Sequence, residues 1–264
     1  MNRIDATFSR LRRRDGKALI AYLTVGFPTV RAWAGIVQVL VEEGVDLIEL
    51  GIPFSDPLAD GPTIQAASQR ALDQGITVKR VFDSVEDLRH RYKDLPLVLM
   101  TYYNPVNRFG IKKFCRECVR KQVDGVIIPD LPPEEANDFL KAARPAGVDT
   151  IFLAAPTSSE SRLKRIVRVS NGFIYYVSLT GVTGARASLP RQIESHVRLI
   201  KGMTDLPVCV GFGISRPDQV REVVQMADGA IIGSALLNVI GRSGRNSLRE
   251  VAGFVRRLRA ACHA

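Results

Sequence analysis

The chain contains 264 residues, of which 46% are hydrophobic, and it carries a formal net charge of +10 and four cysteines. No apolar run reaches the length of a membrane span or forms a signal-peptide core, and the cysteines are too scattered for a disulfide framework. These features exclude membrane and disulfide-rich secreted classes and predict a cytoplasmic globular protein. The basic residues are dispersed and not interleaved with aromatic side chains, so a solvated basic surface explains the charge better than nucleic-acid binding does.

Short apolar segments alternate with amphipathic helical segments along the chain. Near the N-terminus, Ile4, Phe8 and Leu11 fall on one helical face and predict a short packed helix. Two helical patterns, at 63–72 and 78–91, occupy the long interval between the second and third predicted strands. The eight predicted strands cover residues 18–24, 47–50, 97–101, 125–128, 150–153, 173–177, 208–210 and 230–232.

The arrangement of these strands predicts a single α/β domain over residues 1–264. The strands are apolar almost continuously, which is typical of a parallel sheet covered on both faces. Eight strand–helix units of this length match a (β/α)₈ TIM barrel better than an open doubly wound sheet. We therefore expect a TIM barrel with an extra N-terminal helix and additional short helices.

The second predicted strand carries an acid between two apolar residues. Glu49 lies between Ile48 and Leu50, and burial there should raise its pKa toward neutrality, where a carboxyl group can both give and take a proton. A structural glutamate bonded to nearby backbone is the alternative. The carboxyl ends of barrel strands face the active site, so a group of residues is expected at one mouth of the barrel: Glu49, Asp60, Tyr102, Asp130, Tyr175, Phe212 and Gly233.

Glycine turns follow the last two predicted strands. Gly213 and Gly233 lie where backbone can approach a ligand, and each turn runs into a helix: Ser215 with Asp218 predicts one helix start, and Gly233 with Ser234 predicts the other. Free N–H groups at such helix starts favour phosphate, and barrel enzymes commonly bind phosphate at these two loops. Tight turns without a ligand are the alternative. The loop at 180–190 is suited equally to a lid over the site and to an ordinary flexible connection.

The remaining reactive side chains argue against other chemistries. The three histidines, His90, His196 and His263, lie in helical patterns or at the tail, so no His-based metal site or Ser/His nucleophile is expected. No lysine lies inside or just after a predicted strand, which argues against a Schiff base. Cys115 and Cys118 have the spacing of a redox or zinc pair, but they lie in one helical run without a second pair. With these chemistries disfavoured, we expect acid–base catalysis by carboxylates on a phosphorylated substrate.

Three motifs carry a family resemblance: Glu49 with the loop Pro-Phe-Ser-Asp-Pro-Leu-Ala-Asp-Gly-Pro at 53–62, Gly-Val-Thr-Gly at 181–184, and Gly-Phe-Gly-Ile-Ser at 211–215. With them, the chain resembles the tryptophan synthase alpha subunit from its N-terminal helix to its last helix. The resemblance implies a carbon–carbon lyase of tryptophan biosynthesis that cleaves indole-3-glycerol phosphate to indole and glyceraldehyde 3-phosphate. The indole would then pass to a beta subunit.

The resemblance also implies roles for individual residues. Glu49 matches the principal acid–base residue and Asp60 the second carboxylate, while Thr183 matches a lid residue that contacts Asp60. The residues that match the indole pocket are Tyr22, Met100, Tyr102, Leu153, Tyr175, Thr183 and Phe212. The residues that match the phosphate cradle are Gly184, Gly213, Gly233 and Ser234. Tyr22, Met100 and Leu153 stand where the family usually has Phe, Leu and Ile, so bulk is kept and only the fine shape of the pocket differs.

The family works with a partner, and the resemblance extends to it. A pyridoxal-phosphate beta subunit is implied, in an alpha2-beta2 heterotetramer, with no metal or cofactor in this chain. The residues matching the partner-facing loops are Pro53, Asp56, Pro57, Asn104, Asp130 and Pro132. A stand-alone indole-3-glycerol phosphate lyase would carry the same site. A catalytically idle activating subunit would be expected to lose Glu49 or Asp60, and a sugar-phosphate isomerase or epimerase would share the phosphate cradle without needing the large aromatic pocket.

Overall fold

A computed structural model describes residues 2–177, 191–211, 213–242 and 247–262. The strands of the described chain are β1 (Ala18–Thr24), β2 (Leu47–Gly51), β3 (Leu97–Met100), β4 (Gly125–Ile127), β5 (Asp149–Ile151), β6 (Leu153–Ala154), β7 (Ile174–Val177), β8 (Val208–Gly211) and β9 (Gly229–Ile232). Its helices are α1 (Arg3–Arg12), α2 (Val30–Glu42), α3 (Pro62–Asp73), α4 (Val78–Arg91), α5 (Tyr103–Phe109), α6 (Ile111–Arg120), α7 (Asn137–Ala143), α8 (Glu160–Val169), α9 (Arg191–Lys201), α10 (Pro217–Met226), α11 (Ser234–Arg242) and α12 (Ser247–Ala261). None of these helices is both long and apolar enough to cross a membrane.

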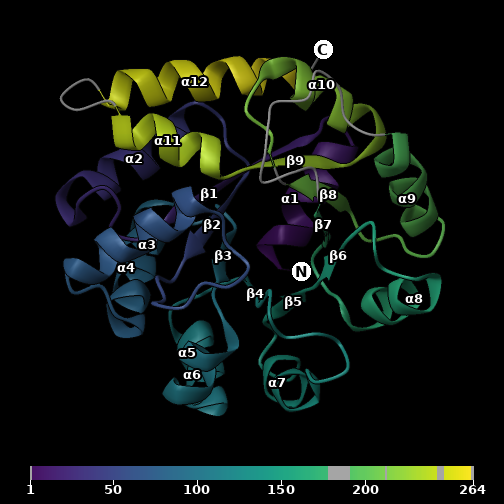
Figure 1. The fold of residues 1–264 in the computed structure, drawn as a ribbon, viewed down its shortest axis with the longest axis horizontal. Helices are drawn as coiled ribbons and strands as arrows, with labels where there is room; N and C mark the ends of the chain where they lie inside the picture. Colours follow the sequence, from purple (N-terminus) through teal and green to yellow (C-terminus); the bar gives the residue numbers. More distant parts are fainter. Residues whose placement is uncertain (1, 178–190, 212, 243–246, 263–264) are drawn as a thin grey trace.

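The strands form one parallel sheet that returns on itself. Their order is β5-β4-β3-β2-β1-β9-β8-β7-β6, and the two end strands are separated in sequence by Phe152 alone. β5 pairs with β4, whereas β6 pairs with β7, so the segment from Asp149 to Ala154 links the two edges of the sheet. Figure 1 shows the strands at the centre with helices around them. The predicted TIM barrel is confirmed. The fifth predicted strand, at 150–153, is divided into β5 and β6 where it changes neighbours, and the two together extend one residue further at each end.

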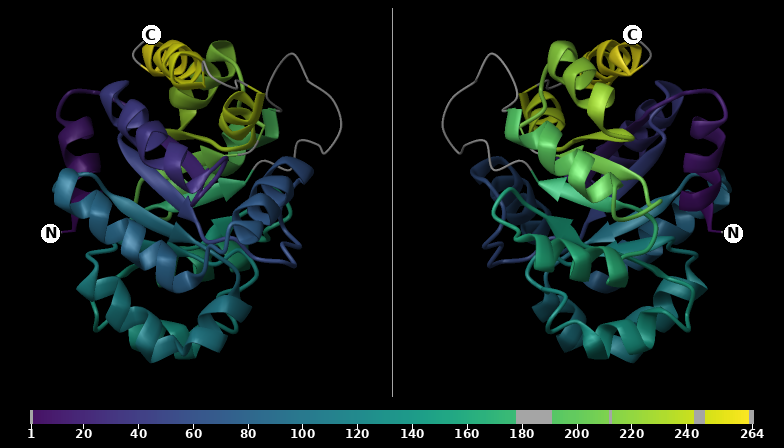
Figure 2. Two further views of the ribbon diagram at one scale, coloured as in Figure 1. Left: turned by 90° about the vertical axis from the view of Figure 1, so that its left-hand side faces the viewer. Right: turned by 90° about the vertical axis from the view of Figure 1, so that its right-hand side faces the viewer.

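The predicted N-terminal helix is confirmed and covers the amino end of the barrel. Ile4, Phe8 and Leu11 are buried against side chains of the barrel interior, and the Phe8 and Phe173 ring centroids lie 6.1 Å apart. The Asn2 side chain begins the helix by accepting a hydrogen bond from the Ile4 backbone N–H. Figure 2 shows α1 at one end of the barrel and the segment joining β2 to α3 toward the other. The N-terminal helix therefore covers the barrel interior at its amino end.

Aspartates at the starts of three strands repeat one hydrogen-bonding pattern. Each aspartate directly precedes its strand and donates its backbone N–H to a carbonyl oxygen of the neighbouring strand. Its carboxylate accepts the N–H of that same neighbouring residue, so one aspartate extends the ladder by two bonds. The pairs are Asp46 with Leu19, Asp124 with Leu97 and Asp228 with Val208.

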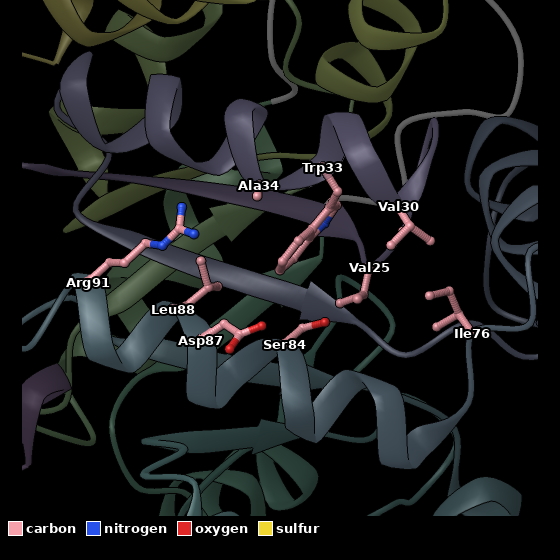
Figure 3. Close-up of a pocket in the computed structure, with 10 residues that line it drawn as sticks. Val25, Val30, Trp33, Ala34, Ile76, Ser84, Asp87, Leu88 and Arg91 are labelled. Carbon is pink, nitrogen blue, oxygen red and sulfur yellow. The ribbon is translucent and has the colours of Figure 1, made fainter.

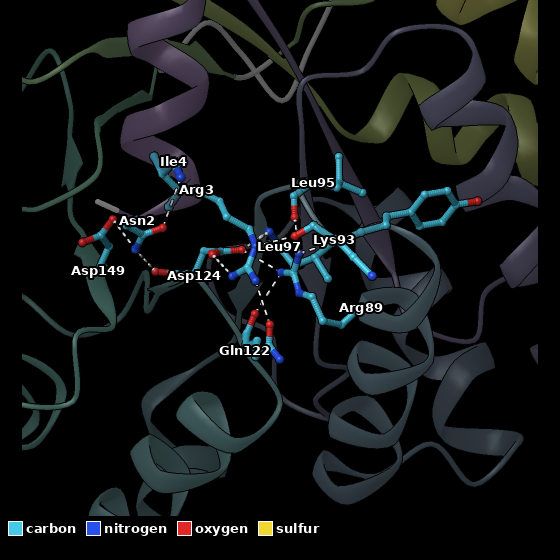
Figure 4. A network of polar contacts seen from close by, with 11 residues as sticks. Asn2, Arg3, Ile4, Arg89, Lys93, Leu95, Leu97, Gln122, Asp124 and Asp149 are labelled. Carbon is cyan, nitrogen blue, oxygen red and sulfur yellow. Dashed lines mark hydrogen bonds and ion pairs between the residues drawn. The ribbon is translucent and has the colours of Figure 1, made fainter.

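Each of these carboxylates also meets a cation. Arg259 of α12 lies 2.7 Å from Asp46, and Lys201 of α9 lies 2.8 Å from Asp228. Asp124 has Arg89 of α4 at 2.8 Å and Arg3 of α1 at 3.0 Å. Figure 4 shows this last network, in which the side chains of Asn2 and Arg3 converge with Arg89 on the loop that carries Asp124. The amino end of the barrel is therefore bound together by charge-assisted hydrogen bonds.

Candidate active site

Glu49 points into the barrel from the middle of β2. Its neighbours across the sheet are Tyr22 on β1 and Val98 on β3. The side chain is fully buried, and neither carboxylate oxygen has a hydrogen-bond partner among the described residues. Burial raises the pKa of Glu49 to about 8, because a charged carboxylate loses its hydration there. The described part of the chain thus gives no support to the alternative of a structural glutamate bonded to backbone.

Asp60 lies at the end of the segment between β2 and α3. Partial burial raises its pKa to about 6, and the Tyr102 hydroxyl beside it opposes that rise by hydrogen bonding to the charged form. The same hydroxyl accepts the backbone N–H of Ala59 at 3.0 Å, and the Tyr102 ring lies 5.6 Å from that of Phe54. Tyr102 therefore holds the loop that carries Asp60 against the end of β3.

Two tyrosines occupy space that two strand glycines leave open. A Cβ atom at Gly51 would overlap the Tyr22 hydroxyl, and one at Gly211 would lie 2.5 Å from the Tyr175 hydroxyl. Both phenols are buried, and the Tyr22 hydroxyl meets Thr24 Oγ1 at 3.3 Å. Neither close approach of a tyrosine to a strand glycine was predicted from the sequence. The available signal was a glycine in an otherwise apolar parallel strand, which often marks a close approach of another group.

The two carboxyl groups and the tyrosines form one electrostatic neighbourhood. The charges of Glu49 and Asp60 both raise the pKa of Tyr22, and they do the same for Tyr175, in each case after the larger effect of burial. Met100 and Leu153 are partly buried against the interior side chains and continue this wall. The structure thus brings Tyr22, Met100, Tyr102, Leu153 and Tyr175 to the end of the barrel where Glu49 and Asp60 lie. Thr183 and Phe212 fall outside the described residues.

The residues expected to bind phosphate lie at the ends of β8 and β9. Gly213 has a φ of +74°, a conformation that favours glycine, and an added Cβ would meet no described atom within 4 Å. Gly233 precedes α11, and its carbonyl oxygen accepts the N–H of Leu237, so α11 begins at Ser234 as predicted. The backbone N–H groups in the first turn of α11 are available to an anion at this end of the barrel. Gly184 falls outside the described residues.

The predicted start of α10 is wrong in detail. Ser215 does not cap this helix through Asp218; the helix begins at Pro217 after Arg216. Gln219 accepts the backbone N–H groups of Ser215 and Arg216 at 2.9 and 3.2 Å, while Asp218 pairs with Arg216 at 2.9 Å. The longer amide side chain of Gln219 reaches back to both N–H groups, whereas the Asp218 carboxylate is drawn to the adjacent guanidinium.

The arrangement has the parts needed for proton transfer on an aromatic substrate. One carboxyl group with a pKa of about 8 lies in an apolar wall, and another with a pKa of about 6 lies at the mouth. At neutral pH the first is mainly protonated and the second mainly ionised, so a proton donor and a fixed negative charge lie at the same end of the barrel. Among the described residues, no three His, Cys, Asp or Glu side chains are grouped so that they could hold a metal ion.

Comparisons with known proteins agree with this geometry. The family model described as tryptophan synthase alpha chain matches residues 8–263. The tryptophan synthase alpha chains of Geobacter sulfurreducens and Dehalococcoides mccartyi are 46% and 48% identical to this chain, over 99% and 98% of both sequences in each comparison. The crystal structure of tryptophan synthase subunit alpha from Legionella pneumophila is 36% identical, with a TM-score of 0.93 over 100% of this chain and 99% of that one. This chain therefore belongs to the tryptophan synthase alpha chain family.

Proposed function

We propose that Glu49 and Asp60 together carry out the reaction of this family, the lyase cleavage of indole-3-glycerol phosphate to indole and glyceraldehyde 3-phosphate. The observation that carries the assignment is the Glu49 carboxyl group, buried in the barrel wall without a hydrogen-bond partner among the described residues. Its raised pKa, about 8, makes it an acid that is loaded with a proton at neutral pH and can recover that proton later in the same turnover.

The reaction divides into two proton transfers that balance. Glu49 first donates its proton to carbon 3 of the indole ring, which gives the ring a positive charge shared with its nitrogen. The carboxylate of Asp60 accepts a hydrogen bond from the ring N–H and stabilises this charge as it develops. Glu49, now ionised, takes the proton of the hydroxyl group on the adjacent side-chain carbon. That carbon becomes the aldehyde, the bond to the ring breaks, and its electron pair restores neutral indole.

The surrounding residues bind the two halves of the substrate. The side chains of Tyr22, Met100, Tyr102, Leu153 and Tyr175 supply the apolar and aromatic wall that an indole ring requires, and Phe212 is proposed to complete it. Backbone at Gly213, Gly233 and Ser234 binds the phosphate, supported by the position of Ser234 at the start of α11. Thr183 and Gly184 are proposed to act from the 180–190 loop. No resident cofactor is proposed for this chain.

The family implies a beta partner, and the loop between β2 and α3 is proposed to meet it. Leu58 in this loop is 91% exposed, and the neighbouring Asp56 is also exposed. These exposed side chains leave the loop free to contact another chain. Because the same loop carries Asp60, a partner that binds its ordered form would raise the activity of this site. We propose an alpha2-beta2 heterotetramer in which the beta subunit alone holds pyridoxal phosphate.

An assay of indole release from indole-3-glycerol phosphate tests the proposal. The chain alone should release indole, and a cognate beta subunit should raise the rate. Glu49→Gln should abolish release with or without the partner, whereas Glu135→Gln, an exposed glutamate on the segment before α7, should leave it unchanged. A rate that no beta subunit alters would favour the stand-alone lyase. Full activity of Glu49→Gln would refute the assignment of the acid.

A further inference from the structure

A cavity lies outside the barrel, between α2 and α4. It has a volume of about 130 Å³, and its floor is formed by buried apolar side chains that include Val25, Trp33, Ile76 and Leu88. Figure 3 shows the Trp33 indole extending from α2 into this space, opposite the side chains of α4. A cavity of this size holds about four waters, or a branched aliphatic side chain of similar volume. It therefore fits a small molecule and not a segment of another protein.

The rim of the cavity carries one charge of each sign. Asp87 and Arg91 are exposed residues one turn apart on α4, and both line the opening. Side chains at this spacing lie on the same helix face, yet these two form no ion pair with each other or with any residue that the structure describes. Other charged pairs on helices of this chain, such as Lys79 with Asp83 on the same helix, do pair at 2.9 Å. An unpaired anion and cation beside an apolar floor complement a ligand that carries both charges.

The indole N–H of Trp33 adds a further unsatisfied group. Trp33 is 5% exposed, and its Nε1 atom has no acceptor among the described residues. A buried N–H without a partner destabilises a folded protein, because the group has lost its hydrogen bond to water. Because Trp33 lines the cavity, its unsatisfied N–H is a candidate donor to a ligand oxygen there. The cavity thus offers an apolar floor, two opposite charges and a donor.

We propose that this cavity binds a free α-amino acid with an apolar side chain of about the size of leucine. The ligand ammonium group would pair with Asp87 and its carboxylate with Arg91, while its side chain would pack against Val25, Ile76 and Trp33. Both charges of the ligand are needed, because only a zwitterion satisfies the two rim residues together. This site is separate from the barrel mouth and does not depend on the reaction assigned there.

The single tryptophan of the chain makes this site directly observable. Because Trp33 is the only tryptophan and lines the cavity, a change in its fluorescence when a ligand is added to the folded chain reports on this site. Titration of the full chain with L-leucine should give a saturable change in emission with a Kd of about 1 mM or tighter. Equilibrium dialysis with labelled L-leucine measures the same binding independently of fluorescence. If dialysis shows no saturable binding of L-leucine or L-methionine, the proposal is wrong.

Ligand analogues and variants separate the amino-acid site from an unselective apolar cavity. 4-Methylpentanoate lacks the ammonium group and 3-methylbutylamine lacks the carboxylate, so each should bind at least about tenfold more weakly than L-leucine. Asp87→Asn and Arg91→Gln should each weaken L-leucine by a similar factor, and Ala34→Leu should block the cavity. His90→Gln, an exposed change on the same helix outside the lining, is the control. Equal affinity for all three ligands, or unchanged affinity in both charge variants, would overturn the proposal.

Discussion

Replacement of Glu49 by glutamine tests whether burial controls the chemistry of this carboxyl group. Burial raises the Glu49 pKa from 4.5 to about 8. Each pH unit between two pKa values corresponds to ~1.4 kcal/mol, so charging Glu49 inside the barrel destabilises the fold by at most about 5 kcal/mol. Local relaxation and entry of water reduce this penalty, and we expect about 2 to 3 kcal/mol to be measured.

The sign of the effect follows from proton binding. The folded chain holds the Glu49 proton more tightly than the unfolded chain does, so wild-type stability decreases as pH rises from about 4.5 toward about 8 and levels off above that. Glutamine does not ionise and has no such decrease. The difference in unfolding free energy between Glu49→Gln and wild type should therefore shift in favour of the variant across this window.

Urea unfolding followed by Trp33 fluorescence at several pH values measures this difference. Glu135→Gln, at an exposed position, is the control and should show no comparable shift. A difference that stays constant from pH 5 to pH 9 would refute the argument from burial. In parallel, indole release by Glu49→Gln should fall by about 10² or more. If Glu49→Gln loses activity but shows no stability shift, Glu49 is catalytic but its carboxylate is not desolvated in the folded chain.

Four further changes test other parts of the site and its support. The pH profile of kcat/KM should rise through about pH 6 as Asp60 ionises (the lower limb) and fall through about pH 8 as Glu49 ionises. Asp60→Asn should lose about 10²-fold in kcat with little change in KM. If the Asp60→Asn profile keeps the lower limb, that limb belongs to ionisation of the substrate phosphate. Tyr102→Phe removes the hydroxyl that lowers the Asp60 pKa, so the lower limb should move to higher pH; an unmoved limb would show that the contact is absent in solution. Gly51→Ala should destabilise the fold by about 1 to 3 kcal/mol in urea unfolding, because its Cβ overlaps Tyr22, and unchanged stability would contradict this packing. Asp149 has a pKa raised to about 7 by burial, so wild type should lose stability from about pH 4 to 7; Asp149→Asn should be about 1 to 2 kcal/mol more stable at pH 8, and a less stable variant would contradict the shift.

Periodicity was sufficient to predict the barrel. The pattern at 78–91 matches α4 at both ends, and the strand at 18–24 matches β1. These elements have strong local signals: Thr77 caps α4 by accepting the Arg80 N–H, and β1 is apolar and buried throughout. The division of the fifth strand at Phe152 could not be predicted, since it depends on which neighbours the two halves pair with and not on local sequence.

The candidate site was only partly visible in the sequence. Glu49 stood out because an acid inside an apolar strand is uncommon, and its burial could be anticipated from that context. The absence of a hydrogen-bond partner among the described residues could not, since a glutamate bonded to nearby backbone fits the same sequence. The fit of Tyr22 over Gly51 could not, because it requires the register of β1 against β2. The cavity between α2 and α4 could not be predicted from the sequence either. Trp33 has the pattern of an ordinary packing residue, and the cavity beside it is formed by two helices that are far apart in sequence.

The aspartate pattern at the amino end of the barrel has a consequence for how this protein can change. Asp46, Asp124 and Asp228 fix neighbouring strands to each other at the end where Arg3 and Arg259, near the two chain termini, also bind. Strand alignment is therefore secured at the end opposite the substrate. Loops at the carboxyl end do not have to align the strands, so they can vary in sequence and length. Substrate and partner preference can change with these loops, while the contacts at the amino end keep the strands aligned.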